Sequence, residues 1–157
     1  MVWIHDITLF FGIIIVITQR SFLINNMEVE LIHTQGMGLE AEVVLNGRKL
    51  VVMDSFSPPL APMSPGNLKN PMFSANEFSD QSWEDMFSGN PDRDKRLEHI
   101  DGWKYLGYGE IVSVNPTILD LGDIQLEAGP NTHDKRCIGE YIKVIIDRLD
   151  LYADVER

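Results

Sequence analysis

A period-two alternation of apolar and polar residues begins at Met27, and it constrains this chain more than any other feature of the sequence. Residues 28–33 and 39–46 both place apolar side chains at alternate positions. Because neighbouring side chains of a strand point to opposite faces of its sheet, each segment predicts a strand with one buried face. We therefore expect residues 27–157 to form a single β-rich domain, which is long enough to bury a core of its own.

The dipeptide Asn46-Gly47 directly follows the second predicted strand. Both central residues of a type I′ turn adopt positive φ, which Asn and Gly tolerate best, so this dipeptide predicts a tight hairpin. In such a hairpin Val43 faces Leu50, and the apolar face of one strand continues onto the next. The third strand is expected to end near Phe56.

Local signals after Phe56 predict a loop and then one short helix. Residues 57–72 hold five prolines, which lack the backbone N–H that sheet pairing needs, so we expect an irregular surface loop. Ser74 and Glu77 have the spacing of a capping box, and the apolar residues that follow repeat with a helical period. These signals predict a helix over residues 75–88, whose apolar face needs a surface to pack on.

Residues 90–101 are charged and are expected to connect this helix to a second group of strands. The later strands are predicted over residues 103–114, 117–126 and 140–152. Asn115-Pro116 predicts a turn, and a phase change at Gly122-Asp123 predicts a β-bulge.

The predicted order is three strands, one helix and three strands (β-β-β-α-β-β-β), which is mainly β with one short helix. This layout resembles that of small Greek-key β-barrels of the OB type. An open α+β sheet or a β-sandwich with the helix on one face is the alternative. The resemblance lies in the order of elements and not in a sequence motif, so it implies no function.

Residues 1–26 differ in composition from the rest, since they hold only one acid, Asp6, and one base, Arg20. Their apolar run over residues 7–17 corresponds to about 16 Å of helix, against roughly 30 Å for the hydrocarbon core of a bilayer. Three interpretations stay open: an apolar extension upstream of a natural start at Met27, a membrane anchor, or an additional strand or helix packed on the domain. We expect a cytoplasmic protein, or one tethered to a membrane through residues 1–26 if they are an anchor.

The chain has 24 acidic and 13 basic side chains, and its net charge of −11 belongs entirely to residues 27–157. A field of this sign disfavours nucleic acid and anionic lipid as partners, because few cations can replace their counterions. Cys137 is the one cysteine, which excludes an internal disulfide framework and a structural Cys₂ or Cys₄ zinc site. A basic protein or peptide is the partner that this charge favours.

The first candidate site is Trp103, Lys104, Tyr105 and Tyr108, interleaved with two glycines. Aromatic rings on an exposed strand face can stack on bases or sugars, and glycines let a ligand approach the backbone. Such a site suits an oligosaccharide, a peptide or single-stranded nucleic acid. The alternative is that the aromatic rings belong to the core and the glycines mark bends of a barrel.

His133 and Cys137 are weak candidates for metal ligands or for a nucleophile and its base, with His99 or His33 as further ligands. The alternative is a polar loop with a small buried cysteine. Five acids could together hold a hard cation, but their spacing is not that of an EF-hand, and solvated strand faces explain them more simply. These acids are Asp120, Asp123, Glu127, Asp147 and Asp150.

No phosphate-binding loop, dinucleotide-binding, serine-hydrolase or zinc-protease motif is present, so the sequence favours a protein without catalysis and predicts no cofactor. The function that it favours is a non-catalytic acidic β-barrel module that binds a protein or peptide partner. Two alternatives stay open: an OB-type binder of single-stranded nucleic acid or oligosaccharide, and a Cys/His-dependent or metal-assisted enzyme.

Overall fold

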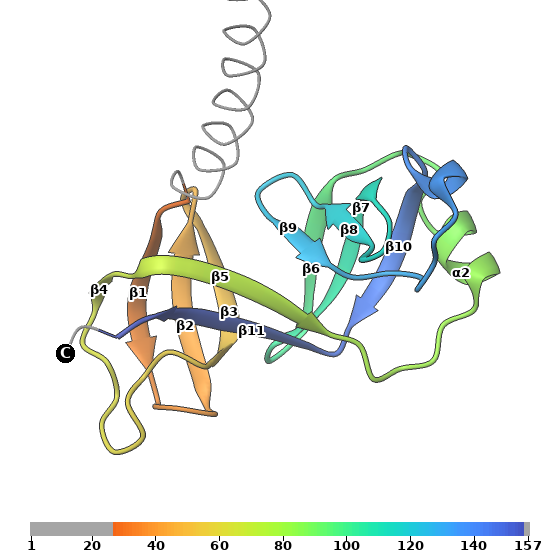
Figure 1. Ribbon diagram of the computed structural model, residues 1–157. Helices are drawn as coiled ribbons and strands as arrows, with labels where there is room; N and C mark the ends of the chain where they lie inside the picture. Colours follow the sequence, from red (N-terminus) through yellow and green to blue (C-terminus); the bar gives the residue numbers. More distant parts are fainter. Residues whose placement is uncertain (1–26, 156–157) are drawn as a thin grey trace, which may run out of the picture.

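Eleven strands and one short α-helix make the described part of the chain mainly β, as the alternation predicts (Figure 1). The structure is a computed structural model that describes residues 27–155. Its strands form two curled, half-barrel sheets, which agrees with a barrel-like fold. The OB topology stays a prediction, and the interpretations of residues 1–26 lie outside the described residues.

The first sheet has six strands, and the last strand of the chain lies inside it. Its order is β4 (Gly66–Asn67), β1 (Val29–Thr34), β2 (Glu40–Leu45), β3 (Arg48–Asp54), β11 (Arg148–Asp154) and β5 (Lys69–Asn76). β11 is parallel to β3 and antiparallel to β5. The first five strands and the C-terminal strand therefore make one unit of the fold.

The second sheet has five strands, all from the stretch between β5 and β11. Its order is β10 (Tyr141–Ile146), β7 (Lys104–Ser113), β8 (Ile118–Asp120) and β9 (Gln125–Glu127), and β6 (Arg96–Asp101) also pairs with β7. The helix α2 (Trp83–Ser88) packs on β10 and buries Met86. A short 3₁₀ helix, η1 (Lys135–Cys137), precedes β10.

The β2–β3 hairpin confirms the turn prediction in its register. Val43 faces Leu50 across the pair, and Asn46 and Gly47 have φ values of 50° and 75°. In both strands, buried residues alternate with half-buried or exposed ones, so one apolar face continues across the turn.

The helix that forms, Trp83–Ser88, is shorter than the one that the capping-box spacing predicts over residues 75–88. Ser74 lies within β5 and pairs with Asp150 of β11, so the backbone there is extended. The helix begins at Trp83, where the Ser82 hydroxyl accepts a hydrogen bond from the Asp85 N–H at 3.0 Å. Strand pairing with a distant segment therefore overrides the local helix signal, because it satisfies a whole row of backbone groups.

Other boundaries differ for the same reason. The predicted loop over residues 57–72 includes β4 and the first half of β5, and the predicted connection over residues 90–101 includes β6. The phase change at Gly122-Asp123 is the turn between β8 and β9 and not a bulge. The single strand predicted over residues 140–152 is two strands, β10 and β11, which lie in different sheets.

Buried side chains of both sheets form one hydrophobic cluster, and within it Tyr105 of β7 also bonds to the backbone of β3. The Tyr105 ring is 1% exposed. Its hydroxyl accepts a hydrogen bond from the Val51 N–H at 2.8 Å and donates one to the Val51 carbonyl at 2.9 Å. β11 pairs with β3 only at Met53 and Asp54, so the hydroxyl takes the place of a strand neighbour at Val51.

Replacing this hydroxyl tests its contribution. Tyr105→Phe removes the partner of two backbone groups of Val51, so we expect the free energy of unfolding to fall by about 1–3 kcal/mol in a denaturant titration. Tyr152→Phe, at a ring that is 41% exposed, is the matched control and should change stability little. Equal effects of the two substitutions would contradict a linking role for Tyr105.

Candidate functional site

Two neighbouring pockets lie along the line where the two sheets meet. β5 ends the first sheet and β9 ends the second, and these two strands contact each other. The Met72 pocket is lined by Met27 and residues 70–73, 120 and 122–125; the Glu77 pocket is lined by residues 74, 75, 77, 115–117 and 127–131. Since Phe73 lines one pocket and Ser74 the other, the two pockets follow each other along β5.

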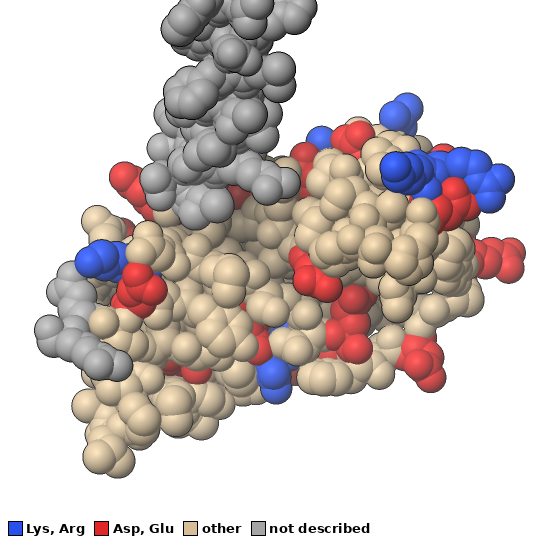
Figure 2. Space-filling model, in the orientation of Figure 1, with Lys and Arg blue, Asp and Glu red and all other residues tan. Residues whose placement is uncertain are grey.

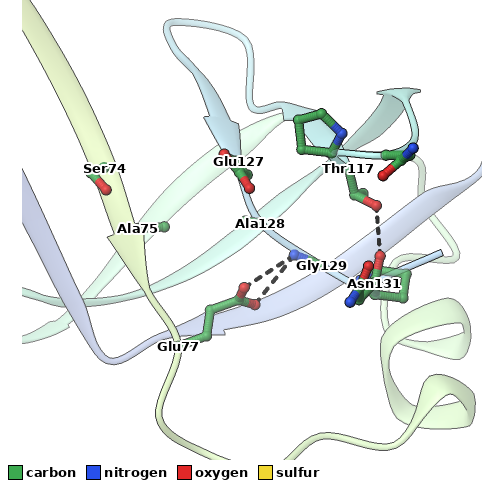
Figure 3. Close-up of a pocket in the computed structure, with 11 residues that line it drawn as sticks. Ser74, Ala75, Glu77, Thr117, Glu127, Ala128, Gly129 and Asn131 are labelled. Carbon is green, nitrogen blue, oxygen red and sulfur yellow. Dashed lines mark hydrogen bonds between the residues drawn. The ribbon is translucent and has the colours of Figure 1, made fainter. Parts of the chain in front are cut away.

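The Glu77 pocket has a volume of about 540 Å³ and is built from segments far apart in the sequence (Figure 3). Glu77 follows β5 and points its carboxylate at Gly129, which follows β9. The Gly129 N–H donates to the two carboxylate oxygens, at 3.3 and 3.2 Å. Gly129 has a φ of 101°, and a Cβ there would lie 3.0 Å from Ile142 Cδ1, so glycine is favoured at this contact.

The opposite wall of the Glu77 pocket is held by Thr117, which is buried. Its hydroxyl donates to the Pro130 carbonyl at 2.6 Å (Figure 3). Its own carbonyl accepts from the Ala128 N–H at 3.2 Å. These two bonds fasten the loop after β9 to the turn before β8. They therefore hold this wall of the pocket in position.

The Met72 pocket has a volume of about 590 Å³ and a more apolar wall. Met72 is 59% exposed, whereas its neighbours Phe73 and Ile124 are 8% and 4% exposed and belong to the core. At the polar edge of this pocket, Asp120 accepts a hydrogen bond from Lys95 Nζ at 2.9 Å. The exposed thioether of Met72 is therefore the group most available to an apolar ligand.

Carboxylates dominate the charge of both pockets. Glu77 and Glu127 line one, Asp120 and Asp123 line the other, and no Lys or Arg is among the described residues that line either. Acidic side chains are also spread over the face shown in Figure 2, where basic ones occur in a few separate places. The Glu77 pocket therefore favours a cationic group over an anionic one.

Desolvation by the surrounding chain raises the pKa of Glu77 above its ordinary value, although the residue as a whole is exposed. The hydrogen bond from the Gly129 N–H opposes this rise, and the negative charge of Asp147 adds to it. The ionised form of the carboxylate is therefore less stable here than in water. A positive charge brought into the pocket would stabilise the ionised form.

This shift predicts a pH dependence of stability. The folded chain holds the Glu77 proton to a higher pH than the unfolded chain, so the free energy of unfolding falls as the pH rises through that window. Glu77→Gln carries no charge at any pH, so its stability relative to the natural chain should increase from about pH 4 to about pH 7 in thermal melts.

Glu84→Gln removes the same charge from the exposed surface of α2 and sets the baseline for that comparison. If both variants follow the same pH profile, Glu77 titrates like an ordinary surface acid and the desolvation argument fails.

Of the aromatic residues predicted to form a ligand platform, Tyr105 is buried and Trp103 and Tyr108 are half-buried. Strand alternation turns the Tyr105 ring into the core, so it is not exposed as stacking on a ligand requires. The Arg96 guanidinium lies over the Tyr108 ring, 4.0 Å from its centroid. Lys104 Nζ lies 3.6 Å from the Asp147 carboxylate. These four predicted residues follow one another along β7 and its start, outside the two pockets.

His133 and Cys137 are placed differently from each other: His133 is exposed, and Cys137 is 7% exposed at the end of η1. Between them, hydrogen bonds from Arg136 lower the pKa of Asp134 to about 2. Over residues 27–155, no group of three or more His, Cys, Asp or Glu side chains is arranged to hold a metal ion. In this part of the chain, therefore, the two residues belong to no larger ligand set.

The site differs from every grouping that the sequence suggested. The sequence suggests Asp120, Asp123 and Glu127 as candidate cation ligands, and this is its one indication of a site near the two pockets. Glu77 was missed, because its spacing from Ser74 assigned it to a helix start. Only the contact between β5 and β9 brings these residues together.

Comparisons with known proteins do not identify the chain. No protein family matches the sequence, and it has no significant similarity to a curated protein or to a solved structure. Among the helices of the described residues, none is long and apolar enough to cross a bilayer. The function is therefore inferred from the geometry and charge of the two pockets.

Proposed function

We propose that this protein is a non-catalytic acidic β-barrel module that binds a protein partner, and that the partner docks across the Met72 and Glu77 pockets. One observation carries the proposal: two adjacent pockets of about 590 and 540 Å³ have four carboxylates and no Lys or Arg among their described lining residues, and one of the four, Asp120, is paired with Lys95 at the pocket edge. Pockets of this size in a row along a terminal strand suit several side chains of one peptide segment.

The charge of the whole chain supports a basic partner. A net charge of −11 attracts a cationic segment over distances of about the Debye length, roughly 8–10 Å at physiological salt, and raises its association rate. The same field repels nucleic acid and other anionic partners. Long-range attraction and local pocket charge thus select for the same partner chemistry.

Selection from a random peptide library on the immobilised full-length chain tests this proposal. We expect the selected peptides to be enriched in Lys and Arg and to bind less tightly as salt is raised. Glu77→Gln combined with Glu127→Gln should weaken binding roughly 2- to 30-fold, because each partly exposed ion pair contributes roughly 0.2–1 kcal/mol.

A control with the same change in net charge separates pocket binding from general attraction. Glu28 and Glu84 are exposed and lie outside both pockets, so Glu28→Gln combined with Glu84→Gln should leave the affinity close to that of the natural chain. The proposed site would be ruled out if the selection enriched no peptide at low salt. It would also be ruled out if the two double variants lost the same amount of affinity.

A further inference from the structure

The spacing of the two pockets along β5 restricts the ligand. Residues 70–73 line the Met72 pocket, and residues 74, 75 and 77 line the Glu77 pocket, so the centres of the two sets lie about four residues apart. At about 3.3 Å per residue of strand, this separation is roughly 13 Å. A ligand that fills both pockets must place two side chains at about that distance.

An extended segment meets this requirement over a short length. In a strand, residues i and i+4 point to the same face and lie roughly 13 Å apart, whereas positions four apart on a helix are separated by only about 6 Å. Residues i and i+3 of a strand point to opposite faces, so they cannot enter both pockets. The distance therefore favours an extended ligand with contact residues four apart.

The two pockets also differ in chemistry. Met27, Met72 and Ile124 are among the residues that line the Met72 pocket; Met72 is largely exposed, whereas Ile124 is buried. The Glu77 pocket presents Glu77 and Glu127, and the Gly129 N–H uses only part of the accepting capacity of Glu77. One pocket therefore suits an apolar side chain, and the other suits a Lys or Arg side chain.

We infer that the partner segment is an extended peptide that places a large apolar side chain in the Met72 pocket and a Lys or Arg side chain, four residues away, in the Glu77 pocket. This inference rests on the proposed function and specifies the ligand of the same site. The charge complementarity is local, because the cationic side chain meets two carboxylates and no Lys or Arg of the described lining.

Synthetic peptides test the spacing on the full-length chain. The probes are fluorescein-labelled ten-residue peptides of Thr and Ser with Leu at position 3 and Lys at position 7, the reversed order, and a version with Lys at position 6. In fluorescence anisotropy we expect one of the two four-spaced peptides to bind at least about tenfold more tightly than the three-spaced peptide of identical composition.

Protein variants assign each side chain to its pocket. Met72→Asp should lower the affinity for the four-spaced peptide at least about fivefold. Met37→Asp is the control and should leave that affinity unchanged, because Met37 is 52% exposed and lies in the turn before β2. Glu77→Gln should weaken binding of the Lys peptide but leave binding of a norleucine version unchanged, since norleucine keeps the four-carbon chain of Lys without its ammonium group.

The outcomes separate this inference from the function on which it rests. Equal affinity of the three-spaced and four-spaced peptides, or no binding of either while library-selected peptides bind at the pockets, would overturn the spacing and leave the proposed function standing. Failure of the library selection itself would overturn both. Loss of binding in Met37→Asp as large as in Met72→Asp would show that the apolar contact lies elsewhere.

Discussion

The place of β11 between β3 and β5 is the constraint on which the rest of the structure depends. β11 pairs with both strands, so β5 has no position in the first sheet without it. Asp150 of β11 is 1% exposed and accepts hydrogen bonds from Arg148 Nε at 2.7 Å and Asn76 Nδ2 at 2.8 Å. A buried carboxylate is tolerated only with such partners, and Asn76 is the last residue of β5. The strand that carries both pockets is therefore held at the residue before Glu77.

Asp147 holds together the two segments of chain that run between the first and the second sheet. Asp147 separates β10 from β11, and it accepts hydrogen bonds from the Phe78 N–H, the Ser79 N–H and the Ser79 hydroxyl at 2.7, 2.7 and 2.8 Å. The chain leaves the first sheet just after β5 and returns to it at Asp147, so these bonds join the two crossings. This arrangement keeps the end of β5 beside the second sheet, and the two pockets depend on that proximity.

Local sequence patterns predicted the features of the fold that depend only on residues close together in the chain. The Asn46-Gly47 hairpin forms in the expected register, because the turn geometry and the alternation on both sides agree. Around Ser74 the local and distant preferences conflict: the capping-box spacing favours a helix, but pairing with β11 keeps the backbone extended. The candidate site shares this difficulty, since it joins residues near Glu77 to residues near Gly129 that no local pattern connects.

The sequence by itself determined that the chain is mainly β, which face of β2 and β3 is buried, where the first hairpin turns, and that the chain is acidic. It did not determine the end of β1, where a register shift after Leu31 leaves His33 exposed and buries Thr34. The tertiary structure alone decided that residues 140–152 divide between two sheets, that the helix begins at Trp83, and that β5 meets β9. The reason is that hydrophobic alternation specifies which face of a strand is buried, whereas strand neighbours are chosen through backbone hydrogen bonds that every residue except proline can make. Partners distant in the chain, and the pockets between them, are therefore settled only when all strands pack together.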